Sequence, residues 1–240
     1  MNIPNLIQQF EALLRSITRS GIDKLLDYIR KSDFYKAPAS TKYHLSTEGG
    51  LLLHSLNVLA ALQTVLTRSE TDPDVWEYRV AGQVVATTTW ESMRVMALLH
   101  DICKTFFYTT STRNVKNEQT GKWEKQPFYT INDRMPLGHG DKSVMIIKQY
   151  IDLTTEEMYA IWWHMGFTDA PPNTVTTLHQ AIEKYPIIWA LHTADMMAST
   201  FMEGEKGNKP PFDGIFYLQE AAQGAGEYAD NPVFEEAAAL

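Results

Sequence analysis

The chain has 240 residues, of which 44% are hydrophobic, and its formal net charge is −8 at pH 7. This length and composition favour one elaborated domain with a large core over two domains. The acidic balance argues against broad electrostatic capture of long nucleic acids, although it leaves a local basic groove open. The single cysteine, Cys103, excludes an internal disulfide framework and suits a reducing cytoplasm.

No secretory leader or membrane-spanning segment is apparent in the sequence. The most apolar run, residues 51–62, is too short to cross a bilayer and is interrupted by His54 and Asn57. We therefore expect a cytoplasmic protein without membrane contact, and the sequence leaves a homo-oligomer open.

In the N-terminal third, the sequence predicts helices and a short hairpin. Residues 3–30 have the apolar spacing of one or two amphipathic helices, and we expect 1–35 to pack on a core domain that spans 36–200. A second apolar helix, predicted from Leu51 to Leu66, contains His54. A lone histidine on such a face is more often a packed core residue than a ligand. The alternation of Trp76, Tyr78 and Val80 then predicts a short hairpin within residues 71–90.

The segment Met93–Lys104 places a histidine and an aspartate in an otherwise apolar run. Its apolar residues recur every three or four positions, which predicts a helix buried on more than one face. Burying the Asp101 carboxylate costs several kcal/mol, in the range of about 3 to 5, unless a cation lies beside it. His100 and Asp101 can flank one ion, or Asp101 can simply pair with Lys104. Cys103, among apolar neighbours, is interpreted as a packed thiol.

Two β-prone runs around a polar turn predict a hairpin at about residues 106–131, with Pro127 on an edge strand. The hairpin carries Arg113, Lys116, Lys122 and Lys125. Since it follows the His-Asp pair directly, we expect its base to lie near whatever that pair binds. We take Arg113 as the best candidate for an anion contact, and Lys122 and Lys125 as solvated.

The remaining chain predicts four helices. His139 opens one of them, a capping box at Thr154 opens another that ends near His164, a third covers 175–184, and a fourth begins after Pro186. Asp195 lies on this last apolar helix and has the same burial problem as Asp101. The residues from 201 to 240 form a weakly patterned C-terminal extension.

Six candidate ligands result from this reading, and they are His54, His100, Asp101, His139, His164 and Asp195. Imidazole and carboxylate donors suit first-row divalent metals or magnesium. The motifs GGLLLHS, ALLHDICK, GHGDKS, WWHMG and LHTAD stand in the order His, His-Asp, His, His, Asp. Over residues 40–200 this order resembles the HD-domain metal-dependent phosphohydrolase superfamily, and it is most similar to small bacterial and phage HD hydrolases.

The resemblance implies a fold, a site and an activity. The implied fold is a mainly α HD-domain helical bundle, with the β-hairpin inserted between the second and third metal motifs. One metal would be held by His54, His100, Asp101 and Asp195, and a second by His139 and His164 with Asp101 as the bridge. The ions implied are Mn, Fe, Ni, Co, Zn or Mg. Where this chain has Cys103, the family usually has glycine, and where it has Asp141, glutamate is frequent.

The activity implied is hydrolysis of a phosphoester or phosphoanhydride bond of a nucleotide by a metal-activated water. The implied catalytic residues are Asp101, Lys104, His139 and His164. Lys104, Arg113 and Lys142 are the expected substrate contacts. The partner expected is a small phosphorylated substrate, and nucleic acid is less favoured. Two alternatives stay open: a nuclease or cyclic-nucleotide phosphodiesterase that uses the same site, and a non-catalytic metal-binding HD regulatory module.

Overall fold

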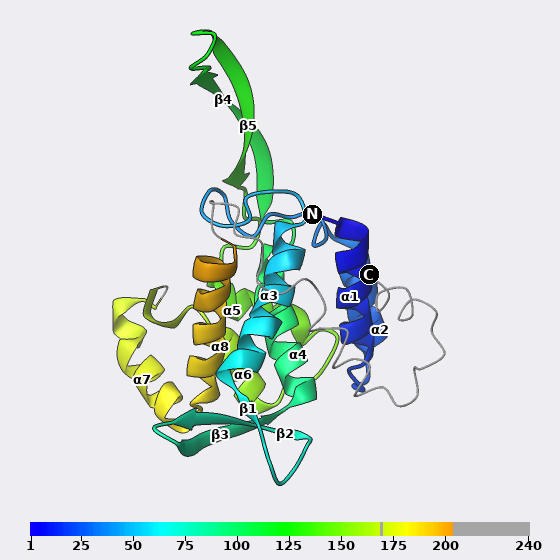
Figure 1. Ribbon diagram of the computed structural model, residues 1–240, viewed down its shortest axis with the longest axis vertical. Helices are drawn as coiled ribbons and strands as arrows, with labels where there is room; N and C mark the ends of the chain where they lie inside the picture. The colour runs from blue at the N-terminus through cyan, green and yellow to red at the C-terminus, as the bar shows by residue number, and fades with distance from the viewer. Residues whose placement is uncertain (169, 204–240) are drawn as a thin grey trace.

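The computed structural model describes residues 1–168 and 170–203, which form eight α-helices and two small antiparallel sheets (Figure 1). The architecture is mainly α, as the sequence predicted. The helices are α1 (Ile3–Arg15), α2 (Ile22–Lys31), α3 (Gly50–Val65), α4 (Trp90–Leu99), α5 (His139–Ile147), α6 (Thr155–Trp162), α7 (Val175–Lys184) and α8 (Ile187–Met197). The strands are β1 (Thr67–Arg68), β2 (Val75–Val80), β3 (Gln83–Thr89), β4 (Tyr108–Lys116) and β5 (Trp123–Ile131).

Helix α3 lies at the centre of the bundle, between α4 and α8 (Figure 1). It is apolar around most of its circumference, and its leucines at 51, 52, 56, 59 and 62 are fully buried. A helix that is hydrophobic on all sides is stable only when other elements cover it. The position of α3 therefore forces its few polar side chains, including His54, into the interior.

Helix α4 ends earlier than the sequence predicted. We expected one helix through Met93–Lys104, but α4 stops at Leu99, His100 is its C-cap, and a 3₁₀ turn, η1, covers Ile102–Lys104. Asp101, with φ −105° and ψ 17°, is the residue at which the α-helix breaks. The expectation of an uninterrupted helix was thus wrong, and the break frees His100 and Asp101 from the fixed angle between neighbouring helical positions.

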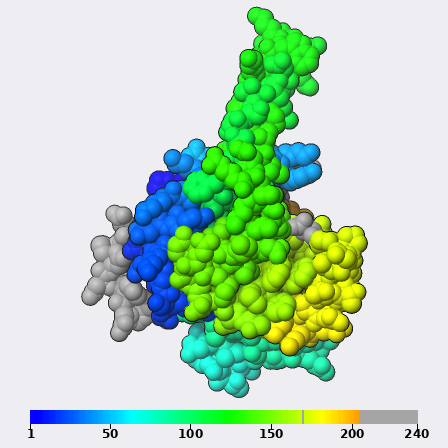
Figure 2. Space-filling view, turned by 180° about the vertical axis from the view of Figure 1, so that it is seen from behind, coloured from blue at the N-terminus to red at the C-terminus, as the bar shows by residue number. Residues whose placement is uncertain are grey.

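Both predicted hairpins are present. Strands β2 and β3 pair around the turn at Ala81 and Gly82, and β1 adds a third strand that the sequence did not predict. Strands β4 and β5 pair along their full lengths, with Tyr108 opposite Ile131 at the base. This second hairpin projects far from the helical body as a two-stranded ribbon (Figure 2).

The end of the described chain packs onto the bundle. A π-helical turn, η4 (Ala198–Met202), continues α8 into the segment that we assigned to the C-terminal extension, and the next residue, Glu203, is buried. Most of the predicted C-terminal extension, from residue 204 to 240, lies outside the described residues. Within residues 1–168 and 170–203, no helix combines the length and the apolar character needed to cross a membrane.

Candidate metal centre

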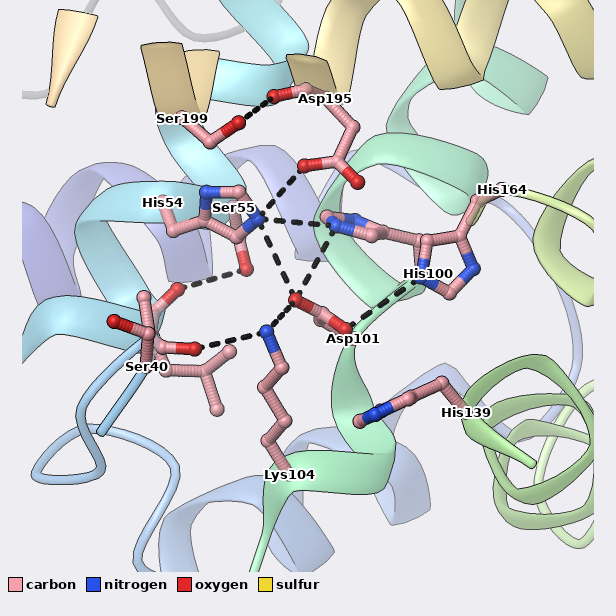
Figure 3. Close-up of polar contacts among 12 residues, drawn as sticks. Ser40, His54, Ser55, His100, Asp101, Lys104, His139, His164, Asp195 and Ser199 are labelled. Atoms are coloured by element: carbon pink, nitrogen blue, oxygen red, sulfur yellow. Dashed lines mark hydrogen bonds and ion pairs between the residues drawn. The ribbon is translucent and has the colours of Figure 1, made fainter. Parts of the chain in front are cut away.

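Five elements bring the candidate ligands together around the broken end of α4 (Figure 3). His54 comes from α3, His100 and Asp101 from the end of α4, and Asp195 from α8. His164 follows the end of α6 and His139 is the first residue of α5. Helices α5 and α6 approach closely at Gly140, where an added Cβ would lie 1.8 Å from the Trp162 carbonyl oxygen. A larger residue at position 140 would push the ends carrying His139 and His164 apart.

The first group of donors consists of His54, His100, Asp101 and Asp195. His54 Nε2 lies 3.3 Å from His100 Nε2, 3.2 Å from Asp195 Oδ1 and 3.4 Å from Asp101 Oδ2. His100 Nε2 lies 3.6 Å from the same Asp101 oxygen. One donor atom each from His54, His100 and Asp195 falls within 4.8 Å of the others, close enough to share one metal ion.

The imidazole rings are held with Nε2 facing the cluster. Nδ1 of His100 donates a hydrogen bond to the Ala97 carbonyl at 2.9 Å, and Nδ1 of His164 donates to the Ile161 carbonyl at 2.7 Å. Nδ1 of His54 lies 3.0 Å from a carboxylate oxygen of Glu203. An oxygen acceptor behind Nδ1 fixes the tautomer that leaves Nε2 as a ligand atom, the usual arrangement of metal-binding histidines.

The two Nε2 atoms that face each other also set an electrostatic requirement. With both Nδ1 atoms protonated, the Nε2 lone pairs of His54 and His100 would meet at 3.3 Å, so a proton or a cation must lie between them. Burial lowers the pKa of His54, but Glu203, Asp101 and Asp195 outweigh burial and raise it well above its usual value. Burial lowers the pKa of His100 to about 4. The two Nε2 atoms and the neighbouring carboxylates therefore favour a positive charge at this point, whether a proton or a metal ion.

Asp101 is the hub of the cluster and is only 2% exposed. Burial raises the pKa of its carboxyl, but Lys104 and the histidines hold that pKa well below its usual value. Its Oδ2 forms a 2.6 Å ion pair with Lys104 Nζ, which also donates a 2.9 Å hydrogen bond to the Ala39 carbonyl. Its Oδ1 lies 3.6 Å from His164 Nε2. The ion pair with Lys104, which the sequence offered as an alternative to metal binding, thus exists alongside the ligand cluster.

His139 lies beside Asp101 and opens onto a cavity. Its Nδ1 is 3.5 Å from Cys103 Sγ, and one donor atom from each of Asp101, Cys103 and His139 lies within 4.8 Å of the others. The cavity has a volume of about 360 Å³ and is lined by Cys103, Phe107, Ile131, Asp133, Pro136, Leu137, Gly138, His139 and Lys142. The base of the β4–β5 hairpin, at Phe107 and Ile131, therefore forms part of the wall beside the cluster.

The expected substrate contacts lie in different places. Lys142 Nζ lies in the cavity wall, 2.6 Å from Asp133 and 5.1 Å from the ring centroid of Phe107. Arg113 lies partway along β4, opposite Gln126, with its guanidinium over the Phe128 ring and away from the cavity lining. A contact between Arg113 and substrate stays a prediction. Of the two residues, Lys142 is the one that lines the cavity.

A carboxylate that the sequence did not predict lies behind His54. Glu203 is 6% exposed, and its Oε2 is 2.6 Å from His44 Nδ1 and 3.0 Å from His54 Nδ1. Asn57 donates a 3.0 Å hydrogen bond to its Oε1. Burial raises the pKa of Glu203, but His54 and His44 lower it to about 2. Glu203 lies in the weakly patterned segment from residue 201 to 240, so no apolar run marked its carboxylate as buried, as one did for Asp195.

The residues present fit a divalent metal. His164 Nε2 is buried and has no hydrogen-bond partner among the described residues, and it faces a carboxylate oxygen. Nitrogen and oxygen donors of this kind suit Mn, Fe, Co, Ni, Zn or Mg. Comparisons of the chain with family models, with curated proteins and with solved structures find no match.

Proposed function

We propose that this protein is an HD-type metal-dependent phosphohydrolase, which cleaves a phosphoester or phosphoanhydride bond of a nucleotide. The main support is the meeting of His54, His100, Asp101 and Asp195, from three separate helices, with donor atoms 3.2 to 3.6 Å apart. These residues stand in the motifs that resemble the HD superfamily, in the order of that family. Buried groups packed only for stability have no need to bring two Nε2 atoms together beside two carboxylates.

In this proposal His54, His100, Asp101 and Asp195 hold a first ion, and Asp101, His139 and His164 contribute to a second. A divalent ion at such a site acts as a Lewis acid toward phosphoryl oxygens and acidifies water. Lys104 orients Asp101 through its 2.6 Å ion pair and keeps that carboxylate charged. The oxygen acceptors behind Nδ1 of His54, His100 and His164 keep these three rings from rotating.

The cavity beside His139 supports a small substrate. Its volume of about 360 Å³ is near the lower end of ligand sites, which span roughly 300 to 1,000 Å³. Phe107, Ile131 and Leu137 offer apolar surface for a base, while Lys142 offers a cation for phosphate. A nucleotide matches this division of the wall better than a bare phosphate does.

The test is hydrolysis by the full chain, stripped of metal and reloaded with Mn²⁺, Co²⁺ or Mg²⁺. We expect phosphate release from at least one nucleoside mono- or triphosphate in a panel, and loss of that release in Asp195→Asn. Elemental analysis of the same samples reports bound metal. Protein that holds metal but releases phosphate from no substrate would instead be the non-catalytic regulatory module.

His139→Ala tests whether a second ion is held. We expect this variant to keep the first ion and lose the second, because His139 groups with Asp101 and Cys103, whereas His54 and Asp195 group with His100. Metal stoichiometry by elemental analysis measures the change. An unchanged stoichiometry in His139→Ala would remove the dinuclear part of the proposal.

One observation favours a nuclease as the second candidate. The projecting β4–β5 hairpin carries four basic residues and two acidic ones, against the acidic balance of the whole chain. A basic ribbon beside the site could track a phosphate backbone. Cleavage of a single-stranded oligonucleotide, weakened in a Lys116→Ala, Lys125→Ala double variant that still hydrolyses mononucleotides, would establish this function.

A further inference from the structure

Cys103 occupies an unusual place beside the metal cluster. It lies on the 3₁₀ turn directly after Asp101 and is 1% exposed, and it is one of the residues that line the cavity. Its Sγ lies 3.5 Å from His139 Nδ1 and 3.9 Å from Asp101 Oδ1. The thiol of this cavity-lining residue therefore contacts two groups proposed as ligands.

A second observation points to a ligand at the same carboxylate oxygen. His164 Nε2 is fully buried, lacks a hydrogen-bond partner in the described part of the chain, and lies 3.6 Å from Asp101 Oδ1. Its Nδ1 donates to the Ile161 carbonyl, so the ring cannot turn Nε2 away from Asp101 without losing that hydrogen bond. An imidazole nitrogen and a thiol thus approach the one Asp101 oxygen that Lys104 leaves unoccupied.

We propose that Cys103 Sγ is a ligand of the second metal ion, with Asp101 and His139, and that its thiolate selects Zn²⁺ or Co²⁺ over Mg²⁺ at this position. The inference rests on the dinuclear form of the proposed function. On binding, the thiol proton leaves to solvent and the sulfur lone pair forms the bond to the metal.

The distances suit such a bond. Zinc binds sulfur at about 2.3 Å and imidazole nitrogen at about 2.0 to 2.1 Å, so tetrahedral angles separate the two ligand atoms by about 3.5 Å. Cys103 Sγ and His139 Nδ1 are 3.5 Å apart. The 3.9 Å between Cys103 Sγ and Asp101 Oδ1 needs only a few tenths of an ångström of closure around an ion.

A sulfur ligand would make the two metal positions chemically different. The first group, His54, His100, Asp101 and Asp195, offers only nitrogen and oxygen. Thiolate is a soft ligand that favours zinc and similar ions, whereas magnesium and manganese prefer oxygen donors. The second position would therefore bind magnesium and manganese more weakly than zinc or cobalt.

The experiment is a Co²⁺ titration of the metal-free full chain, compared with Cys103→Ser and Cys103→Ala. We expect a near-ultraviolet thiolate-to-cobalt absorption to appear as the second equivalent binds, and Cys103 is the only cysteine that can produce it. Both variants should lose this band, keep the visible cobalt absorption of the first ion, and bind second-site Zn²⁺ more than about 10-fold more weakly. Circular dichroism confirms that each variant is folded.

X-ray absorption of the wild-type protein with two bound Zn²⁺ identifies the atoms bound to the metal without the need for a variant. A sulfur neighbour at about 2.3 Å supports the inference, and a shell of nitrogen and oxygen alone overturns it. A band that persists in Cys103→Ala, or a wild-type chain that binds one ion only, also overturns it. A sulfur-bound metal in a protein that hydrolyses no nucleotide would sustain the site while refuting the proposed function.

Discussion

Asp101 and Glu157 are both buried carboxylates, and the protein surrounds them in different ways. Glu157 is 1% exposed and accepts two 2.6 Å hydrogen bonds from the Arg19 guanidinium. It also completes the capping box of α6 with Thr154. Asp101 has an equally short contact with Lys104, but three imidazoles and a thiol also lie within 3.4 to 3.9 Å of its oxygens.

The difference separates a structural ion pair from a candidate site. One guanidinium with two parallel hydrogen bonds balances the charge of Glu157 and satisfies its oxygens. Lys104 already balances the charge of Asp101, so the histidines around it exceed what neutralisation requires. A metal ion needs several such donors, each held in place by a hydrogen bond on its far side. A salt bridge does not need them.

Asp101→Asn should give the largest effect. It removes a carboxylate that faces both proposed metal positions, so we expect metal affinity to fall by more than about 100-fold and phosphate release to be lost. Elemental analysis and the nucleotide assay measure the two losses, and circular dichroism should show retained helical content. Full activity in this variant would remove Asp101 from the chemistry altogether.

Glu157→Gln is the matched change at the structural pair. It leaves Arg19 partly buried without its main partner, and we expect the free energy of unfolding in urea to drop by about 3 kcal/mol. The remaining 2.9 Å bond from Arg19 to Glu91 keeps the loss from being larger. Metal content should not change, and a loss of metal in this variant would break the distinction between the two carboxylates.

Glu203→Gln should weaken metal binding by about 10-fold, because a carboxylate behind an imidazole raises the basicity of the ligand nitrogen. The amide can still accept from His54 Nδ1, so the variant removes charge while keeping shape. Competition with a chelator measures the affinity. Glu77→Gln, a change remote from the cluster on β2, is the control and should leave the affinity unaltered.

The pH dependence of stability should give the smallest effect. Burial raises the pKa of Glu157, but hydrogen bonds from Arg19, Ser92 and Thr154 lower it below the usual 4.5. A carboxyl with a depressed folded-state pKa stabilises the fold above its unfolded pKa and loses that contribution as the pH falls through the folded value. The stability gap between wild type and Glu157→Gln should therefore be constant above about pH 5 and shrink below pH 4.5.

Local patterns in the sequence carried much of the fold. The apolar run at 51–66 predicted α3, and the capping residues Thr154 and Glu157 predicted the start of α6. Alternating residues predicted the β2–β3 hairpin, and two β-prone runs around a polar turn predicted the β4–β5 hairpin. Each of these signals involves residues that are close together in the chain, so it can be read from the sequence alone.

The end of α4 had no such signal. No glycine or proline follows Leu99, and the apolar spacing continues through Ile102, so periodicity extended the helix too far. In the structure, the backbone N–H of Cys103 donates to Ser143 Oγ on α5, and the Lys104 ammonium reaches the Ala39 carbonyl. Contacts with segments distant in the sequence stabilise the break at Asp101. The apolar spacing within one segment carries no information about such contacts.

The sequence by itself determined which residue types were available and that two carboxylates lay on apolar segments in need of a cation. Only the tertiary structure decided which atoms of those residues meet, that Glu203 orients His54, and that Cys103 faces His139. Helix formation depends on neighbours along the chain, whereas a cluster assembled from five elements depends on how their buried faces pack, and no local pattern specifies that packing.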